Sequence, residues 1–384
     1  FFFTRKGAYF MKILHTADWH LGIALHKQSL MEDQYDFIKQ LKQIVMDENI
    51  DVIIIAGDIY DTTLASKEAI ELYDKCMHML CMELQKQVIV IAGNHDSPVR
   101  LSSCSALLAP MGLHVYGKLE EKVKPLILGN TWFYPIPYFH PQTVANLYGV
   151  EIQDEEEAFL CIQNDLEEKL NKKDVCHIAI AHTFMANASV SESDRFATIG
   201  GSGMVSSTVF DKFDYVALGH LHRHQKAGQN AYYSGSPLPY SFSEASYAKK
   251  VLIYDTDNGE IQEKCIQPLH SLKTYSGKLE DVITQLKQDN DTQSYVKIEI
   301  EDKQTTIDMM EYFQELHEGI LQLSGIHEET QSRIGVDLQT METMQDDSIV
   351  KQFFKDMFQE ELDEEEMQLF YEAQKAVKEE EYAS

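Results

Sequence analysis

The chain has 384 residues, a formal net charge of −29 and an apolar content of 44%. This length allows one large hydrophobic core with smaller units appended to it, and the apolar runs are far shorter than the ~20 residues of a membrane-spanning helix. So large an acidic excess argues against nucleic-acid binding through a global basic field, although a local basic track or bound divalent cations could still make that contact.

Five apolar runs in the first 220 residues are predicted to be buried strands. They cover residues 13–17, 52–56, 88–92, 178–181 and 216–219. Apolar residues recur at helical spacing between these runs, over 37–45, 69–84 and 159–170. This alternation of strand and helix predicts right-handed crossovers, and therefore a partly parallel sheet with helices on its faces.

Other elements are predicted from weaker patterns. These are a proline-interrupted strand over 132–137, a polar, Gly-rich loop over 186–205, a strand and turn over 232–239, and a strand over 251–255. Past residue 270 we predict a helix over 279–287, a strand over 295–300 and a helix over 307–323. These last three elements predict a small α+β unit that is separate from the first domain.

We divide the chain into five segments on these patterns. Residues 1–10 are predicted to be a non-native or wrongly assigned extension, because Met11 directly precedes the first strand, and they are left out of the fold prediction. Residues 11–270 form the main α/β domain, 271–327 the α+β unit, 328–347 a polar linker, and 348–384 two short amphipathic helices.

The cysteines and the charge distribution indicate the compartment and the type of tail. None of the six cysteines forms a C-x-x-C pair, which favours free thiols and a reducing, cytoplasmic location. From residue 301 to the end there are 23 acidic and 6 basic residues, a pattern more typical of a solvated or protein-facing surface than of a nucleic-acid surface.

Polar side chains follow all five predicted strands at the point where each strand ends. They are Asp18 and His20, Asp58, Asn94 with His95 and Asp96, His182, and His220 with His222. The carboxyl ends of strands in a helix-covered sheet are where ligands and catalytic groups collect. Any single one of these residues is as well explained as a cap or a turn, and one H-x-H is a weak signal. Their recurrence at five strand ends favours a shared site.

Carboxylate, amide and imidazole groups together suit hard to borderline divalent ions such as Mn²⁺, Fe²⁺, Zn²⁺ or Mg²⁺. Two such ions about 3.5–4 Å apart need a bridging carboxylate. Asp58, in the middle strand of the first crossover set, is the natural bridge.

The order D-x-H, G-D-x-x-D, G-N-H-D, a lone His and G-H-x-H resembles the calcineurin-like metallophosphoesterase superfamily. The five blocks cover Asp18 to His222. The resemblance implies a four-layer α/β sandwich with a dimetal site at the strand ends. It also implies a ligand set: Asp18, His20, Asp58 and His222 for the first metal, and Asp58, Asn94, His182 and His220 for the second. His95 would be the general acid or transition-state stabiliser.

Two residues near the site have an open interpretation. Asp96 either orients His95 or caps the helix that begins near Ser97 and Pro98. At residue 61 the nucleases of this superfamily from archaea and eukaryotes carry a histidine, whereas this chain has Asp61. A carboxylate cannot be assumed to replace an imidazole there, so we assign Asp61 no catalytic role.

Within the superfamily the chain is most similar to the nuclease branch. The similarity is carried by M-K-I-L-H-T-A-D-W-H-L-G at 11–22, G-D-I-Y-D, G-N-H-D-S, Y-V-A-L-G-H-L-H from Tyr215 and Y-S-G-S-P from Tyr233. It implies a Mn²⁺-dependent enzyme acting on DNA in repair, replication and recombination, as a double-strand 3′–5′ exonuclease and a single-strand or hairpin endonuclease. The α+β unit would cap the DNA, the last helices would dock on an ATPase partner, and the nuclease domain would form a homodimer.

Two other functions are compatible with the same motifs. One is a metallophosphoesterase acting on a phosphoprotein or a cyclic nucleotide, but a small substrate would not require the α+β unit or the paired C-terminal helices. The other is a scaffold that has kept the fold and lost its metals, which the intact residues of all five blocks argue against.

Overall fold

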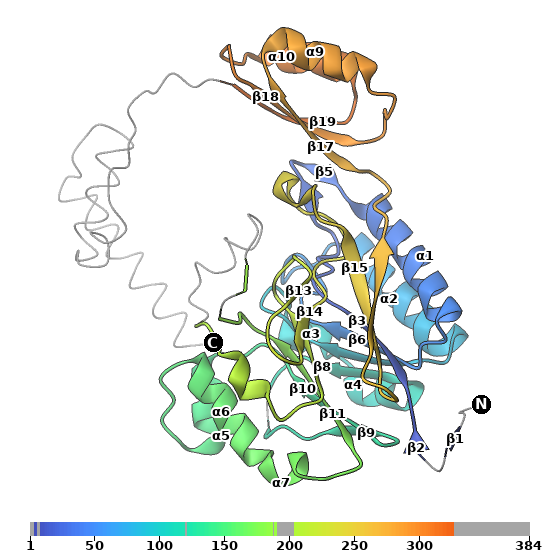
Figure 1. The fold of residues 1–384 in the computed structure, drawn as a ribbon, viewed down its shortest axis with the longest axis vertical. Helices are drawn as coiled ribbons and strands as arrows, with labels where there is room; N and C mark the ends of the chain where they lie inside the picture. The colour runs from blue at the N-terminus through green and yellow to red at the C-terminus, as the bar shows by residue number, and fades with distance from the viewer. Residues whose placement is uncertain (1–3, 6–7, 120, 187, 190–202, 326–384) are drawn as a thin grey trace, which may run out of the picture.

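The computed structural model describes residues 4–5, 8–119, 121–186, 188–189 and 203–325. Two six-stranded sheets pack face to face, and helices cover the outer face of each, so the main body has four layers (Figure 1). This arrangement confirms the predicted four-layer α/β sandwich.

The first sheet has the order β16-β15-β3-β6-β7-β8, and β3, β6, β7 and β8 run parallel. Its strands are β3 (Lys12–Thr16), β6 (Val52–Ala56), β7 (Gln87–Ile91), β8 (Leu113–Tyr116), β15 (Lys249–Asp255) and β16 (Ile261–Ile266). The second sheet has the order β13-β14-β12-β11-β10-β9, with β10, β11, β12 and β14 parallel. Its strands are β9 (Leu126–Leu128), β10 (Thr131–Ile136), β11 (Cys176–His182), β12 (Tyr215–Gly219), β13 (Gln225–Lys226) and β14 (Ala231–Tyr233).

Strand β6 shows why the central strands are continuous apolar runs. Ile53 and Ile55 point to the helices that cover the first sheet, whereas Ile54 and Ala56 point into the layer between the two sheets. Both faces of the strand are therefore buried, as expected of parallel strands enclosed on two sides.

The helices lie where the periodicity predicts them. Helix α1 (Met31–Asp47) buries Phe37, Leu41 and Val45 against the first sheet. Helix α2 (Lys67–Met77) continues as a π-helical segment, η1 (His78–Glu83), and α5 (Pro141–Tyr148) and α6 (Glu155–Asp165) belong to the second sheet's side. The short helical segments are α3 (Pro98–Leu101), α4 (Ser105–Leu108), η2 (Ala109–Met111), α7 (Glu167–Leu170), η3 (Ser207–Phe210) and η4 (Phe242–Glu244). Two-residue ribbons pair β1 (Thr4–Arg5) with β2 (Ala8–Tyr9) and β4 (Ala24–Leu25) with β5 (Gln28–Ser29).

A smaller α+β unit follows the main body. Its parallel sheet has the order β17-β18-β19, from β17 (Leu272–Gly277), β18 (Tyr295–Ile300) and β19 (Ile320–Ser324). Helices α9 (Leu279–Gln288) and α10 (Ile307–Leu316) cover one face of this sheet and enclose a separate core around Val296, Ile298 and Phe313 (Figure 1).

The predicted helix over 307–323 is wrong after Leu316. Helix α10 ends there, and Ile320–Ser324 form strand β19 beside β18. A Cβ atom on Gly319 would lie 2.1 Å from the carbonyl oxygen of Ser294, so the chain approaches β18 too closely for any residue but glycine. The apolar residues after this turn are buried by strand pairing rather than by a helical face.

The small unit is tied to the main body through His270. Its backbone N–H and its Nδ1 atom lie 2.9 and 2.8 Å from the two carboxylate oxygens of Asp33 in α1, and its ring stacks on Tyr295 of β18 at 4.7 Å. The domain boundary at 270/271 stays a prediction. The predicted linker 328–347 and the two predicted helices of 348–384 lie outside the described residues.

No described helix is both long and apolar enough to cross a membrane. All six cysteines are free, and Cys76 and Cys81 are buried in the core between the first sheet and its helices.

Candidate metal centre

The predicted site residues meet at one edge of the sandwich, where parallel strands of both sheets end. Asp18 and His20 follow β3, Asp58 follows β6, and Asn94 and His95 follow β7. From the second sheet, His182 is the last residue of β11 and pairs in register with Gly219, which ends β12 and precedes His220 and His222. Because the sheets face one another, these residues come within contact distance, although the first and last of them lie about 200 positions apart in sequence.

Four of the predicted ligands have a left-handed backbone. The φ angles are +53° at Asp18, +41° at His20, +50° at Asp58 and +109° at His220. Such angles are costly for residues other than glycine and persist where neighbouring contacts impose them, often at functional sites. Here backbone hydrogen bonds join the turns: Asp18 N donates to Gly57 O and His20 N to Asp58 O, each at 3.0 Å.

The glycines before the ligands leave room for the ligands themselves. A Cβ atom on Gly57 would lie 2.2 Å from Nδ1 of His182, and one on Gly93 would lie 2.1 Å from Oδ1 of Asp58. No larger side chain fits at either position without moving a site residue. This packing gives a physical reason for the glycines in G-D-x-x-D and G-N-H-D.

The carboxylate of Asp58 lies between two groups of imidazoles. Its Oδ2 atom is 3.7 Å from Nε2 of His20 and 3.3 Å from Nε2 of His182. His20 comes from the first sheet and His182 from the second, so this one oxygen faces ligands on both sides of the site. That is the position required of a carboxylate shared by two cations.

The other predicted ligands fall into two groups on either side of Asp58. On one side, Nε2 of His222 is 3.1 Å from Nε2 of His20, and Asp18, His20 and Asp58 offer ligand atoms within 4.8 Å of one another. On the other side, Oδ1 of Asn94 is 3.0 Å from Nε2 of His182 and 3.1 Å from Nδ1 of His220. The structure thus brings all seven predicted ligands together.

The donor set fits divalent cations. Oδ2 of Asp18 is buried and has no hydrogen-bond partner among the described residues. A buried carboxylate oxygen without a partner is costly, and a cation would satisfy it. The set of carboxylate, amide and imidazole donors is also the set that ions such as Mn²⁺, Fe²⁺ or Zn²⁺ accept.

Burial and close charges perturb the titration of the site. Burial raises the pKa of Asp18 to about 7. Burial also acts to raise the pKa of Asp58, but the adjacent imidazoles of His182, His20 and His95 together outweigh it and hold that pKa well below its usual value. Burial alone would lower the pKa of His182, but Asp58 raises it to about 9. Metal ligands must be deprotonated, so cations bound here would release the protons that Asp18 and His182 otherwise hold near neutral pH.

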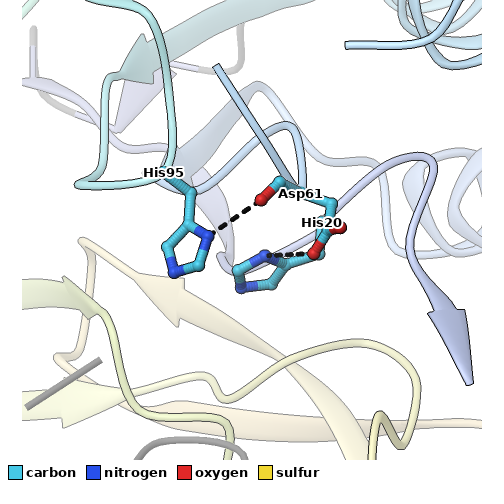
Figure 2. Close-up of side chains that lie close together, drawn as sticks. All are labelled: His20, Asp61 and His95. Atoms are coloured by element: carbon cyan, nitrogen blue, oxygen red, sulfur yellow. Dashed lines mark hydrogen bonds and ion pairs between the residues drawn. The ribbon is translucent and has the colours of Figure 1, made fainter. Parts of the chain in front are cut away.

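His95 lies beside the ligands with its ring oriented by the chain (Figure 2). Its backbone N–H donates to Oδ1 of Asp58 at 2.9 Å, and its ring packs edge-on against His20 at 4.8 Å. Its Nδ1 lies 2.9 Å from the carbonyl oxygen of Asp61. A carbonyl only accepts, so Nδ1 carries the proton, and Nε2 remains as the atom that can exchange a proton with a substrate.

Neither interpretation of Asp96 describes its contacts. Its carboxylate accepts from the backbone N–H groups of Ile59, Tyr60 and Gly93 at 3.1, 3.0 and 2.8 Å. Helix α3 starts after Ser97, which is its N-cap residue. In the described contacts, Asp96 therefore neither caps α3 nor contacts the His95 ring. Its carboxylate joins the loop after β6 to the loop after β7, because three backbone N–H groups there need an acceptor.

Two residues outside the motifs hold the turn after β3 in place. Nε2 of Gln34, in α1, donates to His20 O at 2.9 Å, and its Oε1 accepts from Gly22 N at 3.0 Å. The hydroxyl of Tyr240 donates to Trp19 O at 2.5 Å. A lone Gln on a helix and a lone Tyr after a turn carry no local signal, so sequence reasoning missed both.

A buried ion pair supports the backbone of His222. The ammonium of Lys249, in β15, contacts Glu244 and donates to Ser236 Oγ at 2.8 Å and to His222 O at 3.0 Å. Burial would raise the pKa of Glu244, but Lys249 and His222 together outweigh it and hold that pKa well below the usual range.

Lys249→Met should therefore destabilise the fold strongly, because it leaves the Glu244 carboxylate buried without its cation. Breaking such a pair costs about 3–5 kcal/mol. The measurement is urea unfolding with EDTA present. The neighbouring Lys250→Met is the matched control: Lys250 pairs with Glu263, which is half-exposed, and its loss should cost under about 1 kcal/mol. Equal losses from the two variants would contradict the prediction.

Comparison with known proteins agrees with this geometry. Residues 11–224 match the calcineurin-like phosphoesterase family, and the chain belongs to that family of metal-dependent hydrolases. Within it, the chain is 33% identical to the SbcD subunit of the nuclease SbcCD from Staphylococcus epidermidis, over 90% of this chain and 93% of that protein. It is 31% identical to the protein of the same name from Staphylococcus saprophyticus, over 92% and 94%. These likenesses place the chain in the SbcD branch and make it a dimetal phosphoesterase of the nuclease type.

The C-terminal part also matches a family. Residues 265–366 match the SbcD_C family, described as the type 5 capsule protein repressor C-terminal domain. A dimetal phosphatase from Danio rerio aligns with 67% of this chain and 99% of its own, at 12% identity and a TM-score of 0.39, which is too low to add to the assignment.

Proposed function

We propose that the chain is a Mn²⁺-dependent DNA nuclease subunit. It acts as a double-strand 3′–5′ exonuclease and as an endonuclease on single strands and hairpins, with an SbcC ATPase as partner, in DNA repair, replication and recombination in the cytoplasm. The proposed metal-dependent catalysis is supported by the position of Asp58 Oδ2 between His20 and His182. The names of the staphylococcal relatives support the substrate and the partner.

Two divalent ions, most consistent with Mn²⁺, are assigned to seven residues. Asp18, His20, Asp58 and His222 would hold the first, and Asp58, Asn94, His182 and His220 would hold the second. When bound, the ions lower the pKa of water and polarise the phosphoryl oxygens.

The chain itself supplies orientation and a proton. The Nδ1–H of His95 is held by Asp61 O, which directs Nε2 to the proton transfer. In its doubly protonated form His95 also carries a proton on Nε2, which it would donate to the leaving oxygen of the phosphodiester, leaving the neutral ring with its proton on Nδ1. The same Nε2–H could stabilise charge on the phosphoryl group in the transition state.

The site is tested with a hairpin-ended duplex. The purified full chain, with and without SbcC and ATP, is incubated with the duplex in Mn²⁺ and in Mg²⁺. We expect Mn²⁺-dependent cleavage that SbcC and ATP stimulate. Hydrolysis of a cyclic nucleotide or a phosphopeptide, with the hairpin left intact, would support the alternative phosphoesterase function instead.

The small α+β unit is proposed to cap the DNA, and the segment after it to bind SbcC. Residues 348–384 lie outside the described residues, but their sequence predicts two amphipathic helices, the first of which carries Phe353, Phe354 and Phe358. Burying each phenylalanine would contribute roughly 1.5–3 kcal/mol, which suits an anchor in a partner's groove.

Truncation after Asp347 should therefore abolish SbcC binding and spare the Mn²⁺-dependent hydrolysis of a small phosphodiester. Binding is measured by calorimetry with purified SbcC, and hydrolysis with a chromogenic diester. The full chain is the control for both. Unchanged affinity of the truncated chain for SbcC would refute the docking role, because the anchor would then lie elsewhere.

The proposal also includes a homodimer through the nuclease domain, and a heterotetramer with SbcC. We assign this association to three exposed apolar side chains of the segments after β6 and β7: Leu64, Val99 and Leu107 are 71%, 72% and 73% exposed. Arg100 donates to Thr63 O at 2.8 Å and so joins the loops that carry two of them. Sedimentation of the chain alone measures this association.

A further inference from the structure

The two histidines assigned to the first metal share an arrangement. Nε2 of His20 and Nε2 of His222 face each other at 3.1 Å. Behind each ring lies a carboxylate: Oδ1 of Asp61 is 3.7 Å from Nδ1 of His20, and Oε1 of Glu244 is 3.7 Å from Nδ1 of His222 (Figure 2 shows the first pair). Each ring thus presents Nε2 to the metal position and Nδ1 to an acid.

The histidines assigned to the second metal have different neighbours. Nδ1 of His182 lies 2.9 Å from the carbonyl oxygen of Ala56, and Nδ1 of His220 lies 3.1 Å from the amide oxygen of Asn94. One carboxylate, Asp18, approaches Nδ1 of His182 at 3.9 Å, but Asp18 is itself assigned as a ligand of the first metal. Asp61 and Glu244, which are not assigned as ligands, stand beside the histidines of the first metal.

The Nδ1 atom of His20 requires such a neighbour. It is buried and has no hydrogen-bond partner among the described residues. A histidine that binds a metal through Nε2 carries its proton on Nδ1, and that N–H is almost always given to a carboxylate, a carbonyl or water. The Asp61 carboxylate is within a small side-chain rotation of accepting it.

The same three residues could also be considered as ligands of an extra cation. His20, Asp61 and His95 offer ligand atoms within 4.8 Å of one another. However, Nδ1 of His95 already donates to Asp61 O. Nε2 of His20 is assigned to the first metal, so a second cation on its Nδ1 would require the His20 ring to lose both of its protons. A hydrogen bond from His20 to Asp61 has no such cost.

We propose that Asp61 and Glu244 are positioning carboxylates of the first metal. Each accepts the Nδ1–H of one histidine ligand, fixes its ring and raises its basicity, so both strengthen the binding of the first metal. The proposal deepens the proposed function and depends on its assignment of ligands. Asp61 has a second effect, because its carbonyl oxygen orients His95.

The test is Mn²⁺ binding by the full chain, followed by electron paramagnetic resonance of free Mn²⁺ and by calorimetry. For the unaltered chain we expect two ions with two dissociation constants. Asp61→Asn should raise one of these constants, that of the first metal, by roughly 10- to 100-fold and leave the other unchanged. The unfolding temperature in EDTA should not change, which separates positioning from a structural role.

Asp36→Asn is the matched control. Its side chain is 28% exposed, close to the 33% of Asp61, and it contacts Gln40 in α1 rather than the site. Neither dissociation constant should change in this variant.

Glu244 needs a paired variant, because Glu244→Gln alone leaves Lys249 buried without its acid. Glu244→Gln combined with Lys249→Met removes both charges, and in this variant the constant that rises in Asp61→Asn should rise alone, and by more than in Lys249→Met, which loses the contact with His222 O but keeps Glu244. If this double variant does not fold, Asp61→Asn still decides the proposal for the first metal.

Three results would overturn the inference. The dissociation constants could be unchanged in Asp61→Asn, both could rise equally, or the unaltered chain could bind three ions and Asp61→Asn only two. The last would make Asp61 a ligand. A chain that binds no Mn²⁺ at all would instead contradict the proposed function, so the two failures are distinguishable.

Discussion

Asp58→Asn should abolish nuclease activity while the protein stays folded. Among the described residues, this carboxylate lies within 4 Å of an imidazole on each side of the site, at 3.7 Å from His20 Nε2 and 3.3 Å from His182 Nε2. An amide of the same shape can still accept the His95 backbone N–H through Oδ1, but it offers no charge to share between two cations. Both metals should therefore bind more weakly, and cleavage of the hairpin-ended duplex should fall to background.

The measurements are cleavage, Mn²⁺ titration by calorimetry, and circular dichroism. Asp51→Asn is the matched control, because Asp51 directly precedes the same strand, β6, at the end away from the site and accepts from Lys12 N at 3.0 Å. It should retain metal binding and activity. Substantial Mn²⁺-dependent cleavage by folded Asp58→Asn would falsify the shared-carboxylate assignment.

The ligand positions could be predicted because they depend on the strands. Parallel strands in register end at the same edge, so a polar residue after each apolar run has to arrive there whatever the loops do. His182 illustrates this, since its pairing with Gly219 sets where His220 begins. The left-handed backbone at Asp18 and Asp58 follows from contacts between loops, which no single stretch of sequence contains.

The supporting residues could not be predicted for the same reason. Gln34, Tyr240 and Glu244 act on the site from a helix and from the segment after β14, and each contact depends on the three-dimensional path between distant segments. The contacts of Asp96 also depend on the meeting of two loops. Its neighbours in sequence suggested a helix cap or a contact with His95, whereas its carboxylate accepts hydrogen bonds from three backbone N–H groups in two loops.

The error after Leu316 has a related cause. Apolar residues over 307–323 can be arranged on a helical face, but Gly319 and the pairing of Ile320 with Val296 bury the end of that stretch as a strand. A short apolar run does not distinguish helix from strand when tertiary pairing is available.

His95→Ala should slow the chemical step and leave the metals in place. The imidazole is next to the ligand Asn94, but its Nδ1 is used by Asp61 O and its ring packs against His20 rather than replacing it. Loss of a general acid typically costs ~10²–10⁴-fold in rate. Single-turnover cleavage at saturating Mn²⁺ measures that step, and calorimetry measures metal binding.

His114→Ala is the control, because His114 is a half-buried histidine of β8 whose Nε2 contacts Gln87 away from the site. It should change neither the rate nor metal binding. If His95→Ala loses metal binding together with activity, His95 is a ligand. The backbone argues for the other outcome: the His95 N–H donates to Asp58 Oδ1 in any variant at this position, so the shared carboxylate keeps its orientation when the imidazole is removed. A rate loss without loss of metal would then isolate the proton that His95 supplies.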